Sequence, residues 1–204
     1  PAQIEGCDIY NSANALFVGR LEFYDAFRCY NPVVDELLQQ KCQETLSHAW
    51  ADEPKQPLIV GMGRLTAQKD FGTLIRAFAR MANPSNSRLV ILGEGEERSA
   101  LEALVQQLKL EGQVLLPGFV ENPYAWLSKA RLFVLSSRWE ALPTVLIEAL
   151  ACGVPVVATD CPSGPAEILE NGRWGSLVPL QDQAALVAAM EQGLERPVEK
   201  EQLQ

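Results

Sequence analysis

Ligands for metal ions are scarce in this sequence. Among its 204 residues there is one histidine, His48, and the five cysteines form no Cys-x-x-Cys pair. A structural zinc site needs four Cys or His ligands at close, regular spacings, and no such spacing occurs here. We therefore expect no bound metal, and we interpret His48, which follows a helical segment, as a surface residue.

Signals for export and for membrane insertion are also lacking. The first residues, PAQIEGCDIYN, have neither the basic region nor the apolar core of a signal peptide. No apolar run approaches the roughly 18 to 20 residues that a membrane-spanning helix needs. The odd number of cysteines then favours reduced thiols in a cytoplasmic protein. These cysteines are Cys7, Cys29, Cys42, Cys152 and Cys161.

Positive charge is in the minority. The chain has 17 Lys and Arg against 26 Asp and Glu, and its formal net charge is -9. Proteins that bind nucleic acid through its phosphate backbone need a basic surface. The composition therefore argues against nucleic acid as a partner.

From Pro57 onward, short apolar runs alternate with segments of helical periodicity. The runs are uninterrupted, which is typical of strands that are covered on both faces. Their alternation with helices predicts right-handed crossovers and an α/β fold, a Rossmann-like doubly wound parallel sheet of about six strands. We predict strands at 57–62, 88–93, 113–118, 131–137, 155–160 and 175–180. We predict helices at 71–81, 122–130, 143–152 and 182–194, with two more inside 93–110 and 162–170.

The chain divides into three parts. Residues 1–30 show no legible pattern and are interpreted as a remnant of a preceding domain. Residues 31–56 hold a helix from Val33 to about His48, followed by a linker with two prolines. Residues 57–204 form the Rossmann-like domain, in which Asp70 is expected to cap helix 71–81 through its side chain.

Ligands of doubly wound sheets bind at the carboxyl ends of the strands, where loops lead into helices. A dinucleotide fingerprint would require G-x-G-x-x-G in such a loop. The motif that starts at Gly61 has Thr66 in the third glycine position, and the one that starts at Gly93 has Arg98 there. The sequence therefore does not favour a dinucleotide-binding domain.

Four charged residues lie at this predicted rim. Arg64 and Lys69 share the first loop, where cations would bind phosphate oxygens. Glu140 precedes helix 143–152, and Glu148 is the one charged residue between Ala141 and Thr159, so its burial is costly without a partner. Cations and the N-terminus of a helix would bind a diphosphate. The two carboxylates would accept hydrogen bonds from hydroxyl groups at the two ends of a ligand that has a diphosphate in its middle. A paired-carboxylate glycoside hydrolase would leave the basic loop unexplained.

Six segments together resemble a known family. They are GRLTAQKD, GEGEER, LPGFV, the E-x7-E of WEALPTVLIE, EALACGVPVVATD and SGPAEIL, in this order. They resemble the donor-binding half of retaining GT-B glycosyltransferases of family 4, also called group 1, from about Asn31 to the end. The resemblance implies one half of a GT-B fold, with the reaction in a cleft between two Rossmann-like domains. The first domain, which holds the acceptor site, would lie outside this chain.

The resemblance implies a hexosyltransferase of polysaccharide biosynthesis. It would move a sugar from a UDP- or GDP-linked donor to a saccharide or lipid-linked acceptor, with retention of anomeric configuration. It would need no cofactor and no metal, because cationic side chains and amides stabilise the leaving diphosphate. The full-length enzyme would be cytoplasmic, with peripheral association at the cytoplasmic membrane face. This chain alone is expected to bind the donor but to be catalytically incomplete.

The resemblance also assigns roles to residues. Arg64, Lys69 and Glu140 are the catalytic residues, the two cations neutralising the diphosphate and Glu140 holding hydroxyls of the transferred sugar. Glu148 holds the ribose hydroxyls, amides of 142–144 contact the phosphates, and 118–120 flank the base. The donor-binding set is Gly63, Arg64, Lys69, Gly93, Gly118, Phe119, Val120, Glu140, Ala141, Leu142, Thr144 and Glu148.

Two positions depart from the family pattern. Ala141 stands where the family commonly has glycine, and its methyl group narrows the approach to the sugar. Pro143 has no N–H, which removes one donor to the phosphates. Two other functions stay open on the same scaffold: a nucleotide-sugar epimerase or hydrolase, and a non-catalytic interaction module.

Overall fold

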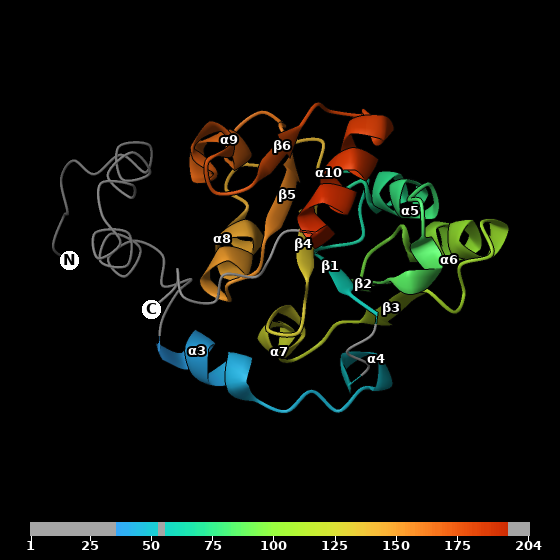
Figure 1. The fold of residues 1–204 in the computed structure, drawn as a ribbon, viewed down its shortest axis with the longest axis horizontal. Helices are drawn as coiled ribbons and strands as arrows, with labels where there is room; N and C mark the ends of the chain where they lie inside the picture. The colour runs from blue at the N-terminus through green and yellow to red at the C-terminus, as the bar shows by residue number, and fades with distance from the viewer. Residues whose placement is uncertain (1–35, 53–55, 196–204) are drawn as a thin grey trace, which may run out of the picture.

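The computed structural model describes residues 36–52 and 56–195, which contain one parallel six-stranded sheet (Figure 1). The strand order is β3-β2-β1-β4-β5-β6. The strands are β1 (Leu58–Met62), β2 (Arg88–Leu92), β3 (Val114–Gly118), β4 (Leu132–Leu135), β5 (Val156–Thr159) and β6 (Ser176–Val178). Every predicted strand is present, and the predicted Rossmann-like doubly wound sheet is confirmed.

Helices cover both faces of the sheet. α5 packs against α6 and α10 on one face, and α8 packs against α7 and α9 on the other. These helices are α5 (Phe71–Ala79), α6 (Arg98–Gln107), α7 (Pro123–Leu127), α8 (Thr144–Ala151), α9 (Pro165–Ile168) and α10 (Gln183–Glu195). Two 3-10 turns, η1 (Pro84–Asn86) and η2 (Glu170–Gly172), lie in the connections. Each helix predicted after Pro57 is therefore present.

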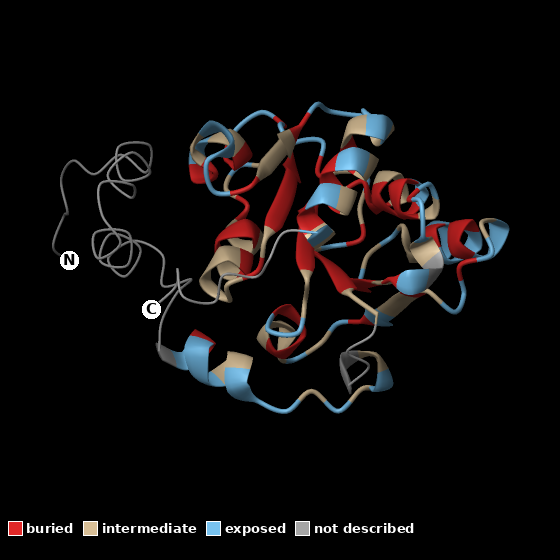
Figure 2. Cartoon of the chain, in the orientation of Figure 1, coloured by how far each residue is buried: buried red, intermediate tan, exposed pale blue. Residues whose placement is uncertain are grey.

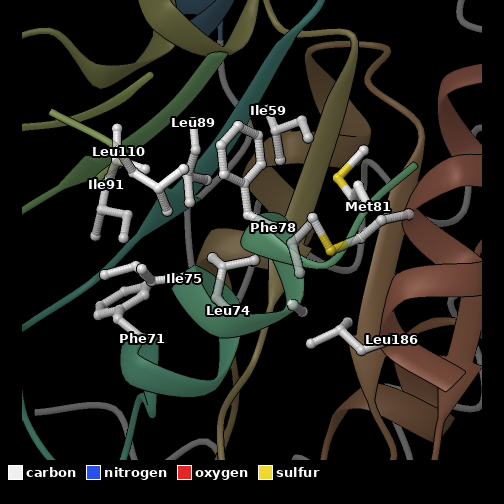
Figure 3. Packing of buried hydrophobic residues seen from close by; sticks show 14 of the residues in the cluster. Ile59, Phe71, Leu74, Ile75, Phe78, Met81, Leu89, Ile91, Leu110 and Leu186 are labelled. Carbon is white, nitrogen blue, oxygen red and sulfur yellow. The ribbon is translucent and has the colours of Figure 1, made fainter. Parts of the chain in front are cut away.

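Successive strand residues belong alternately to two apolar cores. Ile59 contributes to the core beneath α5, α6 and α10, and its neighbour Val60 contributes to the core beneath α7, α8 and α9. Figure 3 shows the first core, where Phe78 of α5 lies between the strand residues Ile59 and Leu89 and the rest of the helix. Because side chains of a strand point to opposite faces, both faces must be covered, and Figure 2 shows the central strands buried.

The segment before β1 differs from the prediction. α3 (Glu36–Gln43) ends five residues before His48, and the short α4 (Ala49–Asp52) lies partly in the predicted linker. The backbone N–H of Trp50 donates to Nδ1 of His48 over 3.2 Å, and the His48 ring packs 5.0 Å from that of Trp126. His48 is therefore half-buried, and not the freely exposed residue that its position after a helical segment suggested.

The predicted cap of α5 is also wrong. Asp70 has φ 47 and ψ 45, in the left-handed region, and its side chain makes no capping hydrogen bond. A capping side chain needs an extended backbone at that position to reach the first amides of the helix. The Asp70 carboxylate instead accepts a hydrogen bond from Nε of Arg138 over 3.0 Å.

Three of the five cysteines lie in the described part of the chain. Cys42, Cys152 and Cys161 form no disulfide with one another in this part of the chain. Cys7 and Cys29, like the whole N-terminal segment 1–30, lie outside the described residues. Within 36–52 and 56–195, no helix is long and apolar enough to cross a membrane.

Candidate functional site

The order of the strands reverses between β1 and β4. These two strands pair in parallel although β2 and β3 separate them in the sequence. In doubly wound sheets, this reversal opens a crevice outside the carboxyl ends of the strands, and ligands bind there. Loop 63–70 follows β1 and loop 136–143 follows β4, so the candidate site is built mainly from these two loops.

Lys69 and Glu140 form an ion pair across this reversal. Nζ of Lys69 lies 2.6 Å from Oε1 of Glu140, and the two side chains are 16% and 5% exposed. The hydroxyl of Ser137 donates to the same carboxylate oxygen. Among the described residues, none donates to Oε2 of Glu140. One carboxylate oxygen is thus held by protein groups, and the other can accept from a ligand.

Further hydrogen bonds join the two loops. The hydroxyl of Ser136 donates to the carbonyl of Lys69 over 2.8 Å, and the N–H of Arg138 donates to the carbonyl of Gln68 over 2.8 Å. The Arg138 side chain binds the Asp70 carboxylate, which is only 9% exposed. This hydrogen bond raises the pKa of the Arg138 guanidinium. Together these contacts hold Lys69 and Glu140 in place.

Sequence reasoning missed four of these positioning residues. Ser136 and Ser137 are buried polar residues directly after β4, and that position was a usable signal. Asp70 and Arg138 carried no such signal, because each depends on a partner that is 68 residues away.

The glycines of the candidate site serve close backbone packing. The N–H of Gly63 donates to the carbonyl of Leu92 over 3.0 Å, and the N–H of Gly93 donates to that of Gly118 over 2.9 Å. At Gly93, φ is 139°, and a Cβ atom would lie 2.0 Å from the carbonyl oxygen of Gly63. The backbones of Gly63 and Gly93 lie close together because the loops after β1 and β2 meet here, and this leaves no room for a side chain at Gly93.

Two predicted base-flanking residues differ in exposure. Phe119, directly after β3, is 81% exposed. Val120 is half-buried and packs against the core beneath α7 and α8. Phe119 is therefore available to a ligand, and Val120 supports the loop that carries it.

The start of α8 offers fewer amides than expected. The N–H of Thr144 donates to the carbonyl of Leu142 over 2.9 Å, and Pro143 has no N–H. Pro143 packs against Gly164, where a Cβ atom would lie 2.4 Å from its ring. Ala141 is exposed. Of the three expected positions, the amide of Leu142 remains available to a phosphate.

Glu148 and Arg64 lack partners within the described part of the chain. Glu148 lies one turn after Thr144 in α8, and burial raises the pKa of its carboxyl. No described residue forms a hydrogen bond with this carboxylate. Arg64 is exposed in the β1 loop, and its side chain has no hydrogen bond or ion pair with another described residue. Both side chains are thus free to bind a ligand.

A hollow of about 830 Å³ lies elsewhere, between β6 and α10. It contains none of the predicted site residues. Glutamates Glu191 and Glu195 line it, whereas no Lys or Arg does. An anionic ligand would be repelled there, so the charged rim at β1 and β4 is the better candidate.

Comparisons with known proteins agree with the predicted family. Residues 43–204 match the model of the glycosyl transferases group 1. The chain is 38% identical over 174 residues to the N-acetylgalactosamine-N,N'-diacetylbacillosaminyl-diphospho-undecaprenol 4-alpha-N-acetylgalactosaminyltransferase of Campylobacter jejuni, covering 85% of this chain and 44% of that protein. It is 42% identical over 134 residues to an uncharacterized glycosyltransferase of Methanocaldococcus jannaschii, covering 65% of this chain and 33% of that protein.

A solved structure shares the fold. HepE of Anabaena, in complex with UDP, superposes with a TM-score of 0.64 at 25% identity, covering 69% of this chain and 40% of that chain. HepE has also been solved with UDP and glucose. This chain spans less than half of the length of these relatives. From the family match over residues 43–204, we conclude that the chain belongs to the glycosyl transferases group 1.

Proposed function

We propose that this chain is the donor-binding half of a hexosyltransferase that uses a nucleoside diphosphate sugar and retains its anomeric configuration. The observation that carries the proposal is the Lys69–Glu140 pair at the reversal of strand order. Arg64 lies in the same loop as Lys69, and Glu148 lies in the helix that follows Glu140. Family membership and the UDP complexes of HepE support a nucleotide sugar as the ligand.

Arg64 and Lys69 would bind the diphosphate. The Lys69 ammonium has three N–H donors, and the ion pair with Glu140 uses one of them. The remaining donors and the exposed guanidinium of Arg64 would neutralise charge that builds up on the leaving diphosphate. The amide of Leu142 and the start of α8 would add to this field. These protein groups would supply the positive charge that the reaction needs at this position.

Glu140 would hold the transferred sugar. Its Oε1 accepts from Lys69 and Ser137, so its orientation is set before the donor arrives. Its Oε2 would accept hydrogen bonds from sugar hydroxyls, beside the diphosphate that Lys69 binds. Lys69 and Glu140 thus belong to one unit that spans the bond to be broken.

Glu148 would bind the ribose. Burial raises the pKa of its carboxyl because the charged form loses hydration. Two ribose hydroxyls donating to the carboxylate would replace that hydration, and Phe119 and Gly118 would flank the base. The ribose therefore gives the isolated carboxylate the partners that no described residue supplies.

The acceptor would bind to a part of the protein outside this chain. The Campylobacter jejuni relative is named for a diphospho-undecaprenol acceptor. We infer a saccharide or lipid-linked acceptor of polysaccharide biosynthesis, and a reaction at the cytoplasmic membrane face with peripheral association. On this assignment, the domain of residues 57–204 binds the donor without completing the transfer.

Calorimetric titration with UDP, GDP and ADP at up to millimolar concentration tests the proposal. We expect saturable binding of UDP or GDP, and we expect Glu148→Ala to weaken it by about tenfold, since hydrogen bonds to a carboxylate contribute about 1.5 to 3 kcal/mol. Glu195→Ala, an exposed carboxylate at the end of α10, is the matched control and should bind like wild type. Absence of heat with all three nucleotides would refute donor binding. Unchanged affinity in Glu148→Ala would refute only the ribose contact.

A further inference from the structure

Two thiols meet at the C-terminal end of α8, one turn after Glu148. Sγ of Cys42, in α3, lies 2.9 Å from Sγ of Cys152, which follows α8. The two residues are 110 positions apart in the sequence, so the fold alone brings them together. Both are half-buried, which leaves them accessible to a small reagent. Neither belongs to the proposed donor site.

α3 is docked on the domain by polar contacts and by one buried leucine. It packs beside α7, and Figure 1 shows it near the lower end of α8. The Asn122 side chain donates to the carbonyl of Lys41 over 3.0 Å and to the Glu44 carboxylate over 2.7 Å. Leu38 is buried, whereas Leu37 is 53% exposed. A helix with so little buried apolar surface separates at low cost, and a covalent link would change that.

Cys42 also lies at the edge of the family match, which begins at the next residue. The thiol pair therefore joins the segment that enters the domain to the helix that carries Glu148. The N–H of Cys152 donates to the carbonyl of Glu148 over 3.0 Å, one turn earlier. A bond between the sulfurs would fasten α3 to the last turn of α8.

We propose that Cys42 and Cys152 form a reversible disulfide, with a low-molecular-weight disulfide as the oxidant, and that this bond locks α3 onto the C-terminal end of α8. Disulfide sulfurs lie about 2.0 Å apart, so the two atoms need to approach by less than about 1 Å. Both residues are at or beyond the last turn of their helices, where the backbone can adjust.

Cys42 is the attacking group. The hydrogen bond between the thiols lowers the pKa of Cys42 and, with burial, raises that of Cys152. The Cys42 thiolate attacks one sulfur of the small disulfide and expels a thiolate, which takes up a proton. The Cys152 thiol then loses its proton, attacks Sγ of Cys42 in the mixed disulfide and expels a second thiolate. Two protein thiols are oxidised to one disulfide, and the small disulfide is reduced to two thiols.

Oxidised glutathione is the probe for the test. In a full-length variant with Cys7, Cys29 and Cys161 replaced by Ser, we expect both remaining thiols to disappear and peptide mapping to find Cys42 linked to Cys152. A thiol reductant should restore both. The same linked peptide is expected from the wild-type chain, so the result does not depend on how well the variant folds. In Cys152→Ser, Cys42 should stop at the mixed disulfide with glutathione.

Amide hydrogen exchange then tests the lock. We expect exchange in α3 to slow by about tenfold or more in the oxidised chain, with α10 unchanged as an internal control. A mixed disulfide without the Cys42–Cys152 link would overturn the proposed site. A linked chain whose α3 exchanges as fast as in the reduced chain would overturn the lock.

Discussion

The coupling free energy between Lys69 and Glu140 measures how strongly loops 63–70 and 136–143 stabilise each other. Its atoms are 2.6 Å apart, and the side chains are only 16% and 5% exposed. At an effective dielectric constant of about 20, unit charges this close attract by about 6 kcal/mol. The cost of dehydrating both groups offsets much of this. We therefore expect a coupling free energy of about 1 to 3 kcal/mol between the two side chains.

The perturbations are Lys69→Met, Glu140→Gln and the double variant. Each single change should lower the free energy of unfolding by about 2 to 3 kcal/mol, because it leaves a largely buried partner uncompensated. The double variant should lose less free energy of unfolding than the two single variants lose together, and the difference is the coupling free energy. Urea unfolding at pH 7 without nucleotide, followed by circular dichroism, measures all four proteins.

The Arg98–Glu94 pair is the matched control. Its atoms are 2.7 Å apart, nearly the same distance, but the Glu94 side chain is 53% exposed. Water screens such a pair, so the same cycle with Arg98→Met and Glu94→Gln should give a much smaller coupling. Equal couplings in the two cycles would refute the argument that burial strengthens the rim pair.

Two further predictions concern single residues. Burial raises the pKa of Glu148 above its ordinary value of 4.5, so the folded state binds the extra proton and stability falls as pH rises from 4.5 through the raised pKa. Without nucleotide, the urea midpoint of Glu148→Gln should therefore be higher than that of wild type at pH 7. Well below pH 4.5 the two midpoints should be the same. Equal midpoints at pH 7 would contradict this argument. Gly93→Ala should lower the free energy of unfolding by about 2 to 4 kcal/mol, because its Cβ would lie 2.0 Å from the Gly63 carbonyl oxygen. Gly112→Ala is its control, since nothing lies within 4 Å of a Cβ there, and comparable losses in the two variants would disprove the steric argument.

Much of the fold could be predicted from local patterns. The run LIVGM is uninterrupted and apolar because β1 is buried on both faces, and the same holds for β4 and β5. Phe71, Leu74, Ile75 and Phe78 recur at helical spacing because one face of α5 covers the sheet. Local patterns failed in the segment before β1, where α3 ends at Gln43 and His48 accepts a hydrogen bond from the N–H of Trp50 at the start of α4.

The sequence by itself determined the succession of strands and helices along the chain, the family, and the isolation of Glu148 in an apolar run. The succession of elements and the isolation of Glu148 follow from spacing and composition within short windows, and the family was identified from the resemblance of six segments. The tertiary structure alone decided that Lys69 pairs with Glu140, that Asp70 binds Arg138 and not the start of α5, and that Cys42 meets Cys152. Each of these contacts joins residues at least 68 positions apart. Their meeting depends on which strands become neighbours and on how the loops between them pack, and no local pattern contains that information.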